Sequence, residues 1–329
     1  MDFTGLIGKF PVNRPLTEMD RKYQLRQDLR LEIAPSDQLA VIRLNSTFLE
    51  TVDKWYGWRG FTTAFALTVL LMFVPGFGLL AFDYILKLLG LAPTKLSTQS
   101  LATSLLFFGI LLALVGWSML SLLRKESFAY THYPVRYNRK AGIVHYFQTD
   151  GEVRSVPWRD VFFTVVPGSN FWAIRGHVLG IDNKTVLDTF AVGPAGSIKS
   201  HLADPATKQY EFPDAVRAHW EFIRRYMEEG PAEPNRIVHF CVPVSDSKET
   251  PAAGFRRVFA NFAGSSLLFR IVIAPFCLWV ILGRLFATAT SKLPQWPAEI
   301  EDACAIEPHD PYAIRGDAKN DRRPDKGFA

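Results

Sequence analysis

Two long apolar stretches without charged residues dominate the hydrophobic pattern of the chain. They occupy residues 60–82 and 96–123, bounded by Arg59 and Asp83 and by Lys95 and Arg124. At a rise of about 1.5 Å per residue, a helix of either length spans a bilayer hydrocarbon core of about 30 Å. Because the connection between them is short, the pattern predicts an antiparallel transmembrane helical hairpin over residues 60–124.

A third apolar segment, residues 258–291, is interrupted by Arg270 and Arg284. The uncharged stretch between these arginines is too short to span a bilayer alone, so a crossing requires both side chains to extend toward headgroups. The alternative is an interfacial or re-entrant helix broken near Pro275. Arg270, Cys277 and Arg284 recur at heptad spacing and share one face, which could pack on the hairpin. The polar tail, 292–329, lies across the membrane in the first case and stays cytoplasmic in the second.

Between the second and third apolar stretches, short alternating segments predict a cytoplasmic β-rich domain over residues 126–249. Asp150-Gly151 marks a hairpin turn. Residues 214–229 form an amphipathic helix with an apolar stripe that includes Trp220 and Ile223. This order predicts an α+β membrane protein with a pleckstrin-homology-like barrel closed by one helix. The expected strands are residues 135–138, 142–148, 153–156, 161–166, 171–178 and 185–192.

The region before the hairpin, residues 1–59, is expected to be cytoplasmic. Thr47-Phe48-Leu49-Glu50 has the form of a capping box and predicts a short interfacial helix that leads into the membrane. Basic residues are commoner outside the hairpin than in its connection, so the N-terminus and the central domain are predicted to be cytoplasmic. The flanking basic residues are Lys54, Arg59, Arg124, Lys125, Arg136, Arg139 and Lys140, against Lys87 and Lys95 in the connection.

The composition excludes some classes of partner but identifies none. The net charge is +5, and 48% of residues are hydrophobic against 21% charged. Much of the basic charge flanks apolar stretches, which favours contact with a lipid bilayer over nucleic acid. The three cysteines are widely separated, so neither a disulfide framework nor a zinc site is expected. The first sixteen residues lack the continuous apolar region of a signal peptide.

No catalytic constellation is visible in the sequence. The seven histidines form no HExxH motif or close pair, and no GxSxG motif is present. His177, in Arg175-Gly176-His177, could bond a ligand, but a structural role on a strand is the favoured interpretation. The prediction is therefore a protein that is not an enzyme, with no catalytic residue, metal ligand or cofactor.

Basic side chains gather in the first strands of the predicted domain and recur in the third apolar segment. The first group could contact anionic lipid, or could simply form a solvated basic face. The second group could contact lipid or a protein partner. The candidates are Arg136, Arg139, Lys140, Arg154, Arg159, Arg270 and Arg284.

Several segments carry a family resemblance, namely residues 41–46, 59–60, 132–139, 156–163, 175–178 and 220–227. Together they resemble the bacterial membrane-protein family catalogued as domain of unknown function 6708. The resemblance implies a multi-pass protein of the Gram-negative inner membrane, often encoded near type VI secretion genes. The family has no established catalytic residues to carry over.

The expected function is a non-enzymatic, partner-binding protein of the bacterial inner membrane. The secretion resemblance implies an accessory or immunity role, with a secretion component or a toxin as the protein partner. The alternative is an anionic-lipid or membrane sensor that acts through the pleckstrin-homology-like domain. A transporter or channel ranks last, because no ionisable pair lies deep in the first two stretches.

Overall fold

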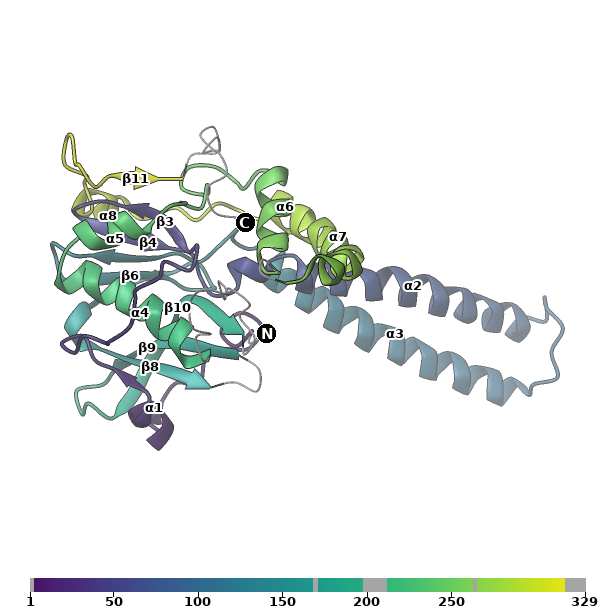
Figure 1. Cartoon of the computed structure of the whole chain (residues 1–329). Helices are drawn as coiled ribbons and strands as arrows, with labels where there is room; N and C mark the ends of the chain where they lie inside the picture. The colour runs from purple at the N-terminus through teal and green to yellow at the C-terminus, as the bar shows by residue number, and fades with distance from the viewer. Residues whose placement is uncertain (1–2, 168–170, 198–211, 263–264, 317–329) are drawn as a thin grey trace. The chain divides into compact units, whose positions relative to one another are not determined.

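The computed structural model describes residues 3–167, 171–197, 212–262 and 265–316, and its helices and strands are labelled in Figure 1. The chain divides into two compact units. The first, which we call the β-rich unit, combines three stretches: Met1–Trp58, Tyr130–Cys277 and Lys292–Ala329. The second, the helical unit, combines Arg59–Ala129 with Leu278–Ser291.

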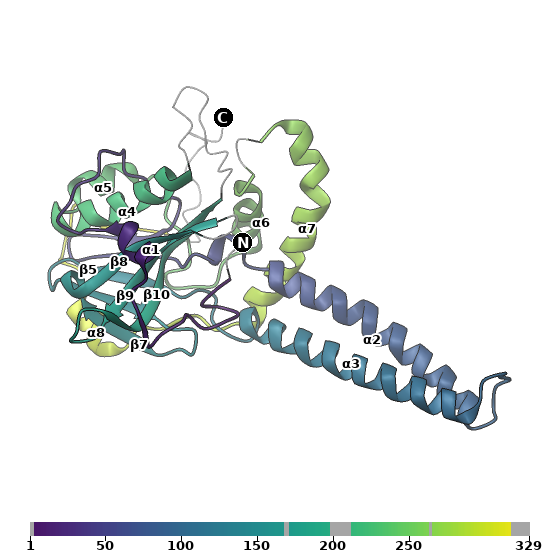
Figure 2. The same cartoon turned by 90° about the horizontal axis from the view of Figure 1, so that it is seen from below.

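The β-rich unit contains two antiparallel sheets. One has the strand order β1-β10-β9-β8-β2 and the other the order β11-β3-β4-β5-β6-β7 (Figures 1 and 2). The strands are β1 Arg14–Pro15, β2 Gln24–Leu25, β3 Val41–Leu44, β4 Phe48–Thr51, β5 Val135–Asn138, β6 Ile143–Phe147, β7 Val153–Pro157, β8 Val161–Pro167, β9 Phe171–Leu179, β10 Thr185–Ser197 and β11 Ile314–Arg315.

All six strands expected in the central part of the chain are confirmed, from β5 to β10. The predicted turn at Asp150-Gly151 joins β6 to β7, and Gly151 has a φ of 94°, a conformation that a residue with a Cβ rarely adopts. Short apolar segments separated by turn residues located these strands.

The short helix predicted at residues 47–50 is wrong. Phe48–Thr51 is strand β4, all four residues are buried, and the strand pairs with both β3 and β5. The side-chain oxygen of Asn45 accepts hydrogen bonds from the backbone N–H groups of Thr47 at 2.8 Å and Phe48 at 2.9 Å. This local bonding favours a tight turn over a helix start, so β3 and β4 form a hairpin.

The sheets therefore extend well beyond residues 126–249. Strands β1 to β4 precede the helical hairpin in sequence, and β11 comes from the tail that was expected to be a polar extension. Two sheets assembled from three stretches of chain differ from the predicted single barrel closed by a helix. The far end of the tail, residues 317–329, lies outside the described residues.

The core of the β-rich unit lies between the two sheets and α4 (Phe212–Glu228), the amphipathic helix predicted from its apolar stripe. Tyr146 of β6 stacks on Phe190 of β10 with ring centroids 4.2 Å apart, which joins the sheets. Trp220 of α4 is fully buried, 4.6 Å from Phe163 and 5.4 Å from Trp158 by ring centroid. Aromatic side chains bury large apolar areas, so this cluster is the centre of the fold.

The β-rich unit also contains shorter helices. They are α1 Glu18–Lys22, α5 Ala232–Ile237, α6 Pro251–Ala260 and α8 Ala298–Ala303. A 3-10 turn, Tyr56–Trp58, rather than the predicted interfacial helix, precedes the hairpin.

The helical unit is built on α2 (Phe61–Leu88) and α3 (Thr98–Glu126), which form the predicted hairpin (Figure 1). The C-terminal half of α7 (Leu267–Thr290) completes it. Both α2 and α7 continue through an internal proline, so α7 is not broken at Pro275. Among the described residues, these three helices are long and apolar enough to cross a membrane by length and composition.

Candidate functional site: a buried arginine network

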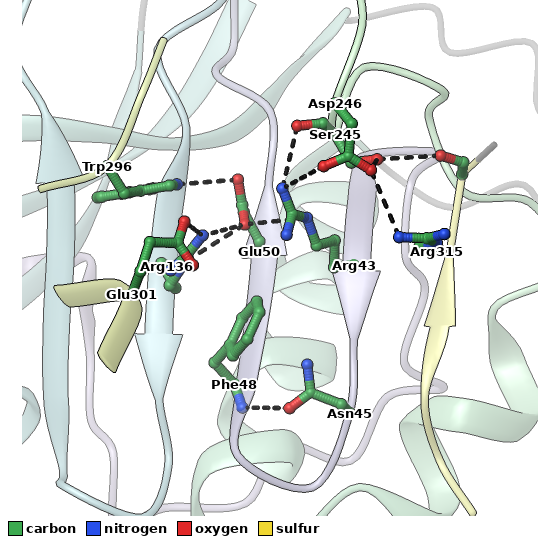
Figure 3. Close-up of polar contacts among 11 residues, drawn as sticks. Arg43, Asn45, Phe48, Glu50, Arg136, Ser245, Asp246, Trp296, Glu301 and Arg315 are labelled. Atoms are coloured by element: carbon green, nitrogen blue, oxygen red, sulfur yellow. Dashed lines mark hydrogen bonds and ion pairs between the residues drawn. The ribbon is translucent and has the colours of Figure 1, made fainter. Parts of the chain in front are cut away.

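The outer face of the six-stranded sheet carries an arginine that is shielded from water (Figure 3). Arg136 of β5 has no exposed surface. Its neighbours Val135 and Tyr137 point into the core, so strand alternation turns Arg136 to the opposite face. Trp296 and Glu301, from the segment after α7, lie over it in Figure 3. The burial of this charge therefore depends on a segment far away in sequence.

Two carboxylates and two aromatic rings surround the Arg136 guanidinium. Glu50 of the adjacent strand β4 accepts hydrogen bonds from Nη2 at 2.9 Å and Nε at 3.2 Å. Glu301 of α8 accepts from Nη2 at 3.0 Å. The rings of Phe48 and Trp296 have their centroids 4.4 and 4.6 Å from the guanidinium carbon, at cation–π distance. Desolvation of a charge is costly unless it is paired, and the two carboxylates offset this cost through Nε and Nη2, whereas Nη1 has no hydrogen-bond partner among the described residues.

The network continues across the sheet to β3 and β11. Arg43 Nε lies 3.8 Å from Glu50 Oε2, and Arg43 Nη2 lies 3.3 Å from Asp246 Oδ1. Arg315 of β11 approaches the other oxygen of Asp246 at 3.5 Å. Three arginines thus alternate with three carboxylates, including Glu301. Their charges balance, which suits a structural clamp better than an anion-binding site.

Neighbouring titratable groups are held in their neutral forms. His145 of β6 lies opposite Arg136, and its Nδ1 is 2.7 Å from Ser155 Oγ. Burial first, and then the positive charge of Arg136, lower the pKa of His145 to about 4. Burial raises the pKa of the Cys304 thiol, although Arg136 acts in the opposite direction. Neither group is set up as a base or nucleophile at neutral pH.

His177 lies inside the five-stranded sheet. Its Nδ1 is 2.8 Å from Thr189 Oγ1, and its Nε2 is 3.6 Å from Asp20 Oδ1. Burial is the main cause that lowers the pKa of His177 to about 4. Burial acts to raise the pKa of Asp20, but hydrogen bonds from Arg14 and Thr17 outweigh it and hold the value at about 2. The side chain therefore links α1 to β9 and β10, which is a structural position.

The predicted basic contact residues do not gather at one site. Arg136 is buried, so it cannot be the lipid contact that its place in the sequence suggested. Arg139 donates to the Ser46 carbonyl at 3.2 Å, and Lys140 pairs with Glu307. Arg154 pairs with Asp188 at 2.9 Å and with Glu152 at 3.1 Å. Arg159 is exposed.

The two arginines of α7 also differ from each other. Arg284 is 1% exposed and its Nη1 donates to the Arg59 carbonyl at 3.3 Å. Arg270 is exposed, and its Nε donates to the Ser265 carbonyl at 3.0 Å. Asp83 of α2, a carboxylate that could have paired with one of these arginines, pairs with Lys87 at 2.6 Å. Heptad spacing correctly placed Cys277 and Arg284 on a buried face, but it did not extend that face to Arg270.

A second polar cluster occurs in the helical unit, where α2 begins and α3 and α7 end. The Glu126 carboxylate accepts from the backbone N–H of Gly60 at 2.9 Å and of Thr63 at 2.7 Å. Arg59 Nη2 donates to the carbonyls of Glu126 at 3.0 Å and Ala287 at 3.1 Å. An anion thus meets a helix N-terminus and a cation meets two helix C-termini, as the helix dipoles favour.

The backbones of α2 and α7 approach closely beside this cluster. A Cβ added to Gly283 would lie 2.1 Å from the Gly60 carbonyl oxygen and 2.7 Å from Ala64. Gly60 has a φ of 98°, and a Cβ there would lie 2.3 Å from the Arg284 backbone nitrogen. Small residues permit this packing, which is typical of helices associated in a membrane.

No group of three or more His, Cys, Asp or Glu side chains within the described part of the chain could hold a metal ion. These features define an α+β protein with membrane-compatible helices and a water-compatible β-rich unit.

The chain belongs to the family described as a family of unknown function, DUF6708, whose profile matches residues 112–308. That match covers more than half of the chain and includes Arg136 and Glu301, but it begins after Glu50. Neither the curated proteins nor the solved structures contained a match to this sequence.

The sequence analysis missed the partners of Arg136. Glu50, Trp296 and Glu301 come from opposite ends of the chain, and no local pattern connects them. One signal was available, since Asn45-Ser46 separates two apolar segments and favours a hairpin. That pairing would have placed Glu50 on a strand rather than in a capping box.

Proposed function

We propose that this protein is an integral membrane protein whose α2–α3 hairpin crosses the bilayer. The observation that carries the proposal is the apolar surface of these helices. Leu71, Met72, Leu106 and Trp117 are 73, 68, 65 and 74% exposed. Helices of 28 and 29 residues are about 42 Å long, more than a hydrocarbon core of about 30 Å requires. Lipid tails would shield this apolar surface, whereas in water it would stay exposed to solvent.

The test is extraction of membranes from cells that express the full chain. A protein anchored by a spanning hairpin stays in the pellet after high salt and alkaline carbonate, and detergent releases it. A double variant, Leu106→Asp with Leu112→Asp, is compared with the unchanged chain. The two charges within α3 oppose insertion of the hairpin, so the comparison separates insertion from surface adsorption. Release of the unchanged chain by carbonate would contradict the proposal.

We further propose that the β-rich unit is cytoplasmic in the inner membrane. Lys54, Arg59, Arg124 and Lys125 flank the hairpin on that side. At the other end of the hairpin, Lys87 of α2 is paired with Asp83, which leaves Lys95 as the basic residue of the connection. The resemblance to a Gram-negative membrane family supports the choice of membrane.

The molecular role we propose is non-enzymatic binding of a protein partner, as an accessory or immunity protein linked to type VI secretion. The support from the structure is that Arg136 is buried in ion pairs with Glu50 and Glu301, and that burial lowers the pKa of His177 to about 4. The link to secretion rests on the family resemblance. Deletion of the gene should leave cells sensitive to toxin delivered by siblings, and re-expression should restore resistance. Full resistance of the deletion strain would contradict an immunity role.

The rival function is an anionic-lipid sensor. Arg136 is buried, and Lys140 and Arg154 have acidic partners. Arg159, in the 3-10 turn Trp158–Asp160, is an exposed cation that forms no ion pair with another described residue. The segment 126–249 lacks β1 to β4 and β11, so the test uses the full chain. Hydrogen exchange of residues 153–160 is compared in nanodiscs with and without phosphatidylglycerol. Unchanged exchange would remove this function.

A further inference from the structure

Both flanks of α7 belong to the β-rich unit. Before the helix, the ring of Phe262 packs edge-on against Trp58, with centroids 5.9 Å apart. Directly after it, the Lys292 carbonyl accepts a hydrogen bond from the Thr131 backbone N–H at 2.8 Å. Trp58 precedes α2 and Thr131 follows α3, so both contacts are made at the end of the hairpin where it joins the β-rich unit.

The tail after α7 is fixed to the same unit at several further points. Strand β11 pairs with β3, and the ring of Trp296 lies 5.4 Å from that of Phe147. Glu301 binds the buried Arg136 at 3.0 Å. Ser46 donates its backbone N–H to Asp310 at 2.7 Å. A tail on the opposite side of the membrane would have to give up a strand, a helix and the neutralisation of a buried cation.

Chain length excludes a return from the far side. Five peptide units separate Phe262 from Leu267, the first residue of α7, and they reach at most about 17 Å when fully extended. The hydrocarbon core is about 30 Å thick. If α7 crossed it, Leu267 would lie on the far side and Phe262 could not reach Trp58.

The surface of α7 still requires an apolar environment. Cys277, Val280, Ile281, Arg284 and Ala287 form a buried stripe at helical spacing. The opposite side exposes apolar residues instead of polar ones. Leu268, Val272, Leu278 and Leu282 are 73, 69, 50 and 68% exposed.

Basic residues lie at both ends of α7. Arg256, Arg257 and Arg270 stand near its start, and Lys292 follows its end. Positive residues concentrate on the cytoplasmic side of membrane segments, where anionic headgroups attract them. Positive charge at both ends is the pattern of a helix that enters and leaves the same side.

From these observations we propose that α7 is not a third span but a helix of the near leaflet. Its two ends face the compartment that holds the β-rich unit, and its exposed apolar side chains contact the acyl chains of that leaflet. The chain then crosses the bilayer twice, and the tail is cytoplasmic. This inference rests on the proposed insertion of the hairpin.

Single-cysteine labelling tests the near-leaflet position of α7 and the insertion of the hairpin separately. In a background with Cys241→Ser, Cys277→Ala and Cys304→Ala, one reporter is added at a time and a membrane-impermeant maleimide is applied to spheroplasts and to inverted vesicles. The reporters are Thr94→Cys in the hairpin connection, Lys184→Cys in the β-rich unit, and Ile306→Cys or Pro308→Cys in the tail. Labelling in detergent confirms that each site is reactive.

The expected result is that Thr94→Cys reacts in spheroplasts, whereas Lys184→Cys and both tail reporters react in inverted vesicles. Reaction of the tail reporters together with Thr94→Cys would overturn the near-leaflet helix and leave the spanning hairpin intact. Reaction of Thr94→Cys together with Lys184→Cys would instead overturn the proposed membrane insertion. Because the background could disturb packing around buried Cys277 and Cys304, the same reporters are repeated in a chain that carries Cys241→Ser alone, where these two thiols are 0 and 2% exposed.

Discussion

The two units of this protein distribute charge in opposite ways. The β-rich unit takes ionised side chains inside and neutralises them there, as at Arg136 with Glu50 and Glu301. The helical unit keeps long apolar surfaces outside and gathers buried ionised groups in one cluster, where Arg59 and Glu126 lie at helix ends and Arg284 of α7 donates to the Arg59 carbonyl. The contrast agrees with the environments proposed above, water for the β-rich unit and lipid for the hairpin. Water tolerates a charged exterior and demands an apolar core, whereas lipid tolerates neither exposed charge nor unsatisfied backbone groups.

The largest expected effect comes from breaking the buried network of the β-rich unit. Arg136→Met leaves Glu50 buried without its main cation, and the loss of one partner of a buried pair costs about 3–5 kcal/mol. Denaturant unfolding of the purified protein in detergent micelles, followed by tryptophan fluorescence, measures the change.

Arg154→Met is the matched control, because its pair with Asp188 is 44% exposed on the arginine side. An exposed pair is worth less than about 1 kcal/mol. Adding Glu50→Gln to Arg136→Met should recover part of the loss, since the double variant no longer buries a lone charge. Equal losses at positions 136 and 154 would contradict the assignment of Arg136 as a buried clamp.

The second prediction is that acid destabilises the β-rich unit through its buried histidines. His145, His177 and His219 each have a folded pKa of about 4 against 6.5 for an unperturbed side chain, and burial is the leading cause. Between these values the unfolded state binds more protons than the folded state. The free energy of unfolding therefore falls as pH drops from about 6.5 to about 4, by up to about 1.4 kcal/mol per pH unit for each histidine.

Unfolding measured at a series of pH values gives this slope directly. A His177→Asn variant should reduce it, because one of the three buried histidines is removed, whereas the raised pKa of Asp37, about 6, acts in the opposite direction and is unchanged. All seven histidines lie in stretches of the β-rich unit, so the helical unit supplies no such dependence. A slope that His177→Asn leaves unchanged would show that this histidine is not buried neutral.

The parts of this fold that the sequence predicted are those encoded locally. Six strands, the hairpin helices and α4 each follow from the period of apolar residues within one segment. The β3–β4 hairpin was not predicted because Thr47 and Glu50 have the spacing of a helix capping box. In the structure the Asn45 side chain instead stabilises a turn. Local competition of this kind depends on hydrogen bonds that spacing alone does not specify.

The arginine network could not be predicted, because its members are brought together only by the tertiary fold. Arg136 looked like one of several surface cations, since nothing near it in sequence offers a carboxylate at strand spacing. Its partners Glu50 and Glu301 arrive from before the hairpin and from after α7. The packing of the tail on the β-rich unit could not be predicted for the same reason, because it depends on contacts with β3, β5 and Ser46.

A smaller effect is expected from overfilling the contact between α2 and α7 in the helical unit. Gly283→Ala places a Cβ about 2.1 Å from the Gly60 carbonyl oxygen, so the helices must separate. Overpacking of this kind costs about 1–3 kcal/mol. Gly109→Ala in α3 is the control, since a Cβ there meets nothing within 4 Å. Thermal unfolding in micelles by circular dichroism should show a loss for the first variant and little change for the second.

The smallest expected effect concerns the carboxylate at the start of α2. Glu126→Gln keeps an oxygen that can accept one of the two bonds from Gly60 and Thr63, but it removes the negative charge from the helix N-terminus. Partly buried charge–dipole contacts are worth up to about 2 kcal/mol, so a loss near 1 kcal/mol is expected. Asp83→Asn, which breaks the exposed pair with Lys87 on the same helix, should cost less than about 0.5 kcal/mol. If the two substitutions are equally mild, Glu126 is not coupled to the dipole of α2. The polar residues where α2 begins would then position the helix without contributing to stability. Electrostatic stabilisation would in that case be confined more strictly to the β-rich unit.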